Sequence, residues 1–224
     1  MCIRDRNQKI LNINLPQERS FEELKKFGLF TNFISEIETF LSHKDKFFLF
    51  KFSEDLIRNY LIQASYNSFS SSSLLSHLND FKNFNMEFNS SFIFIDNITK
   101  ENLNAKTEVF LFNAFNFCLN NKIKIIFSCS DFIKNLNITL PDLESRLNTI
   151  APTEIKDPSE EEKIALITFE LNQRGLKIGK RELNYIFNYH TRHLDSLLKL
   201  ANKLDKVSLE QKKSITINLI KEII

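Results

Sequence analysis

The chain has 224 residues, which suits one domain of ordinary size or a larger domain with a small appendage, and its 42% hydrophobic content is enough for a packed core. A net charge of +2 gives no reason to expect binding to nucleic acid or to a membrane surface. No apolar run approaches the roughly 18 residues of a membrane helix, and the amino terminus has no secretory core. Because Cys2, Cys118 and Cys129 lack metal-ligand spacing, we expect a cytosolic protein with reduced thiols and no metal site.

The first segment in chain order is an amino-terminal arm, residues 1–20. Within it, Gln8–Pro16 has four apolar residues, at Ile10, Leu11, Ile13 and Leu15. One interpretation is an extended arm that packs on the domain. The other is a short linear peptide that docks on a partner, and the sequence leaves both open because terminal segments are poorly specified.

The next segment predicts a helix, a strand and a second helix. Apolar residues recur at steps of three and four over Phe21–Leu41, with Gly28 predicting a break. Lys46–Phe52 is the first strong strand. Ser53 follows as an expected N-cap, with acidic residues in the first turn of the next helix.

This strand–turn–helix order is the one that builds a phosphate-binding loop, but the residues of such a loop are missing. None of the three glycines lies here, and Arg58 and Asn59 stand where the loop would have Lys and Ser or Thr. Glu54 and Asp55 bring two carboxylates to the place of the phosphate. The segment therefore predicts poor binding of ATP and ADP.

The strongest strand of the chain is Ser91–Ile98, whose unbroken apolar run predicts a central strand buried on both faces of a parallel sheet. It ends in Asp96 and Asn97. Polar residues at the carboxyl end of such a strand lie where α/β sheets bind ligands. Asp96 is thus a candidate Mg²⁺ ligand, and the alternative is an N-cap for the next segment.

A helix over Asn104–Asn120 and another central strand over Lys122–Ser128 continue the alternation of helix and strand. That strand runs into Ser130 and Asp131, so hydroxyl and carboxylate groups again follow a strand at the expected ligand edge.

Leu140–Leu147 predicts a short helix with Pro141 in its first turn and Arg146 in its last. Taken alone, Arg146 reads as a surface arginine that pairs with Asp142 or Glu144.

The remainder of the chain is helical. Ser159 and Glu162 form a predicted capping box, and Gly175 is a predicted helix end. Four helices are expected, at 159–174, 180–189, 191–206 and 216–224. His190 and His193 are three residues apart without a third ligand, so we expect packing or exposure rather than zinc binding. The predicted domains are 1–20, 21–152 and 153–224.

Five segments carry a family resemblance in their order and spacing: FIFIDNI, KIKIIFSCSD, LPDLESRL, SEEEKIALITFELNQRGLKI and TRHLDSLLKLANKLD. They resemble the DnaA-like AAA+ family, and most closely its shorter Hda-type members, the regulatory inactivators of DnaA. In Ser91–Ile224 the likeness covers nearly the whole stretch and rests on order and spacing. In Gln8–Asn67 it rests on the strand–turn–helix arrangement and on the amino-terminal arm. The absence of a basic helix-turn-helix module after the last helix favours the Hda type. The expected fold is therefore α/β, an AAA+-like parallel sheet flanked by helices and followed by a small all-α lid.

The resemblance implies roles for individual residues. It implies nucleotide-site positions, from the Walker B acid to the two sensor regions, for Asp96, Asn97, Ser130, Asp131 and Arg192. It implies that Arg146 is an arginine finger presented to a neighbouring subunit's nucleotide. For Arg192, pairing with Asp195 within the lid is the alternative.

The resemblance also implies partners. Gln8, Leu11 and Ile13 stand where Hda-type proteins carry a peptide for the DNA polymerase sliding clamp, and DnaA is the expected target, with self-association as a further expectation. No sequence-specific DNA binding, membrane contact or required cofactor is expected beyond ATP or ADP. The implied function is promotion of hydrolysis of DnaA-bound ATP, without an ATPase activity of its own. The alternatives are a non-catalytic adaptor that binds DnaA or the clamp, and a DnaA-like nucleotide-binding ATPase.

Overall fold

The structure is a computed structural model, and it describes residues 20–26, 28–69, 72–75, 78–83, 91–190, 192–211 and 214–224. The chain divides into two compact units, one comprising Arg19–Glu162 and one that contains Lys163–Ile224. The first is an α/β unit and the second is helical, as the sequence predicts. Across the described residues, no helix has the length and apolar character needed to cross a membrane.

The α/β unit is built on a five-stranded sheet in the order β2-β3-β4-β1-β5, and every pairing is parallel. The strands are β1 (Phe47–Lys51), β2 (Ser72–Leu75), β3 (Phe92–Ile98), β4 (Lys124–Cys129) and β5 (Pro152–Glu154). The predicted strands match β1, β3 and β4. Two edge strands, β2 and β5, were not predicted.

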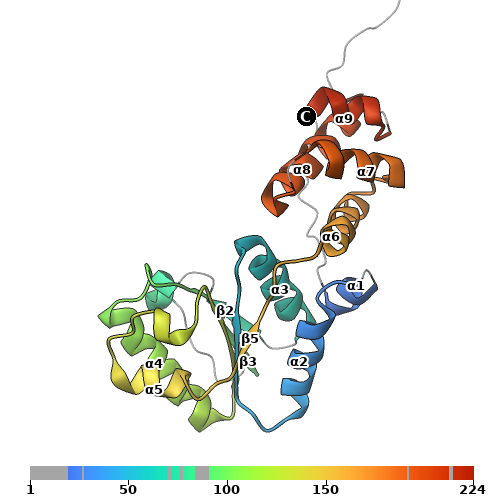
Figure 1. Cartoon of the computed structure of the whole chain (residues 1–224). Helices are drawn as coiled ribbons and strands as arrows, with labels where there is room; N and C mark the ends of the chain where they lie inside the picture. The colour runs from blue at the N-terminus through green and yellow to red at the C-terminus, as the bar shows by residue number, and fades with distance from the viewer. Residues whose placement is uncertain are drawn as a thin grey trace, which may run out of the picture. The chain divides into compact units, whose positions relative to one another are not determined.

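Both faces of the central strands are buried, which explains their unbroken apolar runs. On one face, Leu49, Ile95 and Phe127 belong to a core that includes residues of the helices α4 (Ala105–Asn121) and α5 (Pro141–Leu147). On the other face, Phe50 contacts Phe33 of α2 (Thr31–Ser42), with ring centroids 5.2 Å apart. Figure 1 shows α4 and α5 on one side of the sheet and α2 and α3 (Asp55–Ser68) on the other.

Short and long helices alternate with these strands. The described helices of this unit are α1 (Phe21–Lys26), α2 (Thr31–Ser42), α3 (Asp55–Ser68), η1 (Leu78–Asn83), α4 (Ala105–Asn121), η2 (Ile133–Asn135) and α5 (Pro141–Leu147). Gly28, with φ of 66°, lies between α1 and α2, so the predicted break is confirmed. Residues 72–75 and 78–83 form β2 and η1.

The helical unit contains α6 (Glu160–Gln173), α7 (Lys180–Tyr189), α8 (Leu194–Gln211) and α9 (Ile217–Ile223). The predicted capping box is present, because the Ser159 hydroxyl accepts from the Glu162 amide and the Glu162 carboxylate accepts from the Ser159 amide. Inside the unit, Arg174, the residue after α6, pairs with buried Glu170 of that helix and donates to Asn202 of α8. Along the chain, the first compact unit ends at Glu162 and includes β5, which pairs with β1.

Candidate functional site

The candidate site lies at the edge of the sheet where β1, β3 and β4 end. From β1 the chain passes through α3 to β2, which is one edge of the sheet. From β4 it passes to β5, which is the opposite edge and lies beside β1. The strand order therefore reverses direction at the ends of β1 and β4, which is where open α/β sheets form a ligand crevice.

A bulge at the end of β3 creates the site. Ile95 pairs with Phe127 and Ile98 with Cys129, so Asp96 and Asn97 together oppose the single residue Ser128. Asn97 has a positive φ of 60°, a conformation that Asn tolerates better than most residues. Its backbone N–H donates to the Ser128 hydroxyl at 2.7 Å, and its carbonyl accepts from the Asn102 amide.

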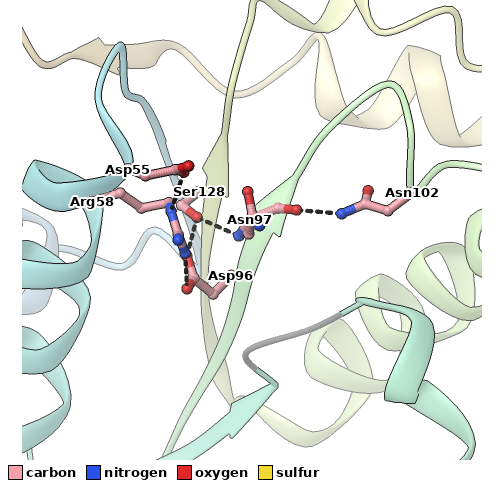
Figure 2. A network of polar contacts seen from close by, with 6 residues as sticks. All are labelled: Asp55, Arg58, Asp96, Asn97, Asn102 and Ser128. Atoms are coloured by element: carbon pink, nitrogen blue, oxygen red, sulfur yellow. Dashed lines mark hydrogen bonds and ion pairs between the residues drawn. The ribbon is translucent and has the colours of Figure 1, made fainter.

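Both oxygens of the Asp96 carboxylate accept hydrogen bonds from its own chain (Figure 2). Its Oδ2 accepts from Nη1 of Arg58, and its Oδ1 accepts from the Ser128 hydroxyl. The side chains of Arg58 and Asp96 are only 9% and 5% exposed, so this is a buried ion pair. Asp55 adds a second carboxylate, 3.3 Å from Nε of Arg58. The alternative of Asp96 as an N-cap is wrong, since Asn104 caps the following helix.

The start of α3 places Arg58 at this edge. Arg58 lies in the first turn of the helix, and helical side chains lean toward the N-terminus, here toward the carboxyl end of β3. The ring of Phe52 covers the guanidinium, with 5.3 Å between its carbon and the ring centroid. Ser53 was expected to cap α3, but Glu54 is the N-cap residue and the Ser53 hydroxyl donates to Asp157 instead.

Ser130 and Asp131 lie beyond the end of β4, in the turn that leads to η2. The Ser130 amide donates to the Ile98 carbonyl at 3.0 Å. The Asp131 carboxylate accepts from the side chain of Asn135 at 3.0 Å and from the Phe132 amide at 2.7 Å. These hydrogen bonds, the one from Asn135 first, lower the pKa of the Asp131 carboxyl. Asp131 therefore stabilises its own turn and makes no hydrogen bond to Asp96.

Arg146 lies on α5 and is held against α4. Its Nη1 donates to the side-chain oxygen of Asn116, and its guanidinium carbon lies 4.6 Å from the ring centroid of Phe112 and 5.4 Å from that of Phe115. Both α4 and α5 are fully described, and in them Arg146 forms no ion pair with Asp142 or Glu144. The expected ion pair of Arg146 with one of these acids is therefore wrong.

Comparisons with known proteins agree with this architecture. A family model described as "Hda, lid domain" matches residues 160–224, the stretch that forms α6 to α9. Domain III of DnaA from Thermotoga maritima is similar at 15% identity, with a TM-score of 0.65 over 94% of this chain and 98% of that one. The chain thus resembles the DnaA/Hda-like AAA+ proteins, in its carboxyl-terminal sequence and in its fold.

Two further similarities are informative. AMPPCP-bound DnaA from Aquifex aeolicus is 17% identical, with a TM-score of 0.59 over 81% of this chain and 64% of that one. An uncharacterized protein of Haemophilus influenzae is 27% identical over 122 residues, which are 54% of this chain and 53% of that protein. The match thus spans about half the length of that relative, and the solved structures support the AAA+ fold alone.

The helical unit is accordingly similar to the lid domain of Hda. Arg192 is exposed and lies two residues before the start of α8 at Leu194. The His190 ring is 3.4 Å from the Ser196 carbonyl. No group of three potential metal ligands occurs in the described part of the chain. Gln8, Leu11 and Ile13 lie outside the described residues.

Arg58 and Ser128 belong to this site, but the sequence did not identify them as site residues. Arg58 had one visible signal, since it is a lone cation in the apolar helix LIRNYLIQA. Ser128 had a weak signal, because it opens the run Ser128–Asp131 of hydroxyl and acid groups that ends an apolar strand. Its role depends on the bulge in β3.

Proposed function

We propose that this protein is a DnaA-related regulator of replication initiation that binds DnaA and promotes hydrolysis of DnaA-bound ATP. The match of residues 160–224 to the Hda lid domain is the observation that carries the proposal. The DnaA-type AAA+ fold supports it. In this scheme the hydrolysed ATP belongs to DnaA, and the sliding clamp, bound through Gln8, Leu11 and Ile13, brings the regulator to replicating DNA in the cytoplasm.

Arg146 is the residue proposed to act on that ATP. A guanidinium presented across an interface stabilises the charge that develops on the transferring phosphoryl group, an effect of roughly 10³–10⁵ in rate for GTPases. Arg146 donates to Asn116 through one nitrogen, and the described residues accept no hydrogen bond from its other guanidinium nitrogens. Those donors are the ones available to a phosphate of a partner.

The test is single-turnover hydrolysis of ATP preloaded on DnaA, with and without this protein and DNA-loaded clamp. The parent protein is expected to accelerate hydrolysis, whereas Arg146→Ala and Arg146→Lys fail. Lysine keeps the charge but loses the planar fork, so the second variant separates geometry from charge. Lys134→Ala, a substitution of an exposed residue in η2, is the control and retains activity. Equal stimulation by the parent and Arg146→Ala contradicts the arginine-finger mechanism.

The adaptor alternative is favoured by one observation, the contact of Arg146 with its own α4. If the parent binds DnaA without accelerating hydrolysis, the adaptor function is correct and Arg146 has a structural role at the α4–α5 contact.

A further inference from the structure

The AAA+ fold implies a magnesium nucleotide at the carboxyl edge of the sheet, and the residues at this edge do not fit one. A Mg²⁺ ligand needs a carboxylate oxygen that faces the metal. In Asp96 one oxygen accepts from Arg58 and the other from Ser128. The three glycines of the chain are Gly28, Gly175 and Gly179, so none is available for a loop around phosphate between β1 and α3.

The charges around the start of α3 also oppose a phosphate. Helix N-termini attract anions, but here Asp55 opens the helix and Glu54 is its N-cap residue, so the protein supplies its own negative charge. Asp157 adds another carboxylate through its hydrogen bond with Ser53. Lys51, the cation at the end of β1, pairs with Glu154 at 3.0 Å.

We propose that Arg58 is a built-in substitute for the magnesium nucleotide, so that the α/β unit folds and acts without any nucleotide. Asp96 is buried and needs a positive charge, because an unpaired buried carboxylate is costly. The Arg58 guanidinium supplies that charge from the same chain. A covalently attached cation loses no translational freedom on pairing, and its contribution does not depend on a ligand concentration.

The first experiment is calorimetry and thermal melting with MgADP and MgATP on the full chain. We expect no saturable heat and no change in melting temperature with either nucleotide. Saturable binding that disappears in Asp96→Ala would overturn the proposal, because it would mean that the carboxylate still serves a bound nucleotide.

The second experiment is a double-mutant cycle with Arg58→Met, Asp96→Asn and the double variant. Removal of Arg58 alone leaves a buried charge, and we expect its melting temperature to fall by roughly 10 °C. MgADP should not restore it. The double variant, which has no buried charge, should melt above Arg58→Met.

Arg181→Met, an exposed arginine-to-methionine change in α7, is the matched control and should melt close to the parent. If Arg58→Met does not fold and the double variant does, the same coupling is demonstrated. Additive effects of the two substitutions on the melting temperature, or a double variant that also fails to fold, would contradict the proposal that Arg58 replaces the magnesium nucleotide by pairing with Asp96.

The third experiment rests on the proposed function. Nucleotide-free regulator, prepared by unfolding, desalting and refolding, should accelerate hydrolysis of ATP on DnaA equally with and without excess MgADP. A requirement for ADP overturns this inference while leaving the regulator function intact. If the parent shows no acceleration at all, the proposed function fails, whereas the calorimetry and the cycle still decide the role of Arg58.

Discussion

Cys118 and Cys129 are free thiols in the core of the α/β unit. Cys118 lies in α4 and Cys129 at the end of β4, and neither is exposed to solvent. Burial raises the pKa of the Cys118 thiol to about 12, although Lys46 acts in the opposite direction, and burial raises the pKa of Cys129 as well. Because thiolates are the reactive species, both thiols should be inert in the folded state.

We expect the Cys2→Ser variant to react with a disulfide-exchange thiol reagent at pH 8 only after unfolding. At a pKa of about 12 the thiolate fraction of Cys118 at pH 8 is about one in ten thousand. In denaturant both thiols should react fully and rapidly. Fast reaction of one thiol without denaturant would show that a local opening exposes it.

The partners of a buried side chain are the part of the site that the sequence could not predict. Asp96 was predictable, because it ends an apolar strand at the ligand edge. Its partners Ser128 and Arg58 are 32 and 38 residues away, and their contact depends on the register of β3 against β4 and on the rotation of α3. Polar groups predicted from the same logic at Ser130 and Asp131 make other contacts, because the strand ends before them.

Helix α4 organises the start of α5 through one buried carboxylate. Glu108 is 1% exposed, and its oxygens accept from the amide and hydroxyl of Thr139 and from the amide of Leu140. Leu140 is the N-cap residue of α5, which carries Arg146, and its own side chain makes no capping bond. The first turn of α5 is therefore held by α4.

Replacing Glu108 with glutamine should destabilise the protein by about 2 kcal/mol, because the amide loses charge and offers donors to groups that already donate. Denaturant unfolding measures this change. Asp142→Asn, an exposed acid in the first turn of α5, is the control and should cost under about 0.5 kcal/mol. Equal costs for the two variants would contradict the role given to Glu108.

Gly28 joins α1 to α2 in a conformation that disfavours side chains. Its φ is 66°, and nothing lies within 4 Å of where a Cβ would be, so only backbone strain opposes substitution. Gly28→Ala should cost about 1–2 kcal/mol in unfolding free energy, whereas Gly28→Asn should cost less because asparagine tolerates this region. A Gly28→Ala variant as stable as the parent would mean that the α1–α2 turn can rearrange.

The helices and central strands were predictable from the sequence because their periodicity is strong, but the edge strands were not. β5 has three residues, includes Pro152 and pairs only with β1. β2 is formed by the serine and leucine run Ser72–Leu75, which is polar enough to resemble a loop. Both are strands because parallel neighbours supply hydrogen bonds, and this tertiary cause leaves no local pattern.

At the scale of the whole molecule, the chain combines an α/β unit with a helical unit, and the role of its first residues is tested separately. If Gln8–Leu15 binds the sliding clamp, Gln8→Ala with Leu11→Ala should abolish clamp binding and leave the melting temperature unchanged. A linear peptide concentrates its affinity in a few anchors. Clamp binding is measured by surface plasmon resonance with Lys9→Ala as the control. Unchanged binding in the double variant contradicts the clamp peptide, and a large loss of thermal stability supports an arm packed on the domain.

The Arg58–Asp96 ion pair also constrains the order in which this edge of the sheet can change by mutation. Loss of Arg58 alone leaves a buried carboxylate, and insertion of glycines between Phe52 and Asp55 alone loosens the start of α3 while its carboxylates still repel phosphate. Each single step toward a phosphate-binding loop therefore lowers stability before any ligand can compensate. A change of this edge into a phosphate-binding loop would therefore require several substitutions at once, so selection acting one mutation at a time would favour retention of the Arg58–Asp96 pair.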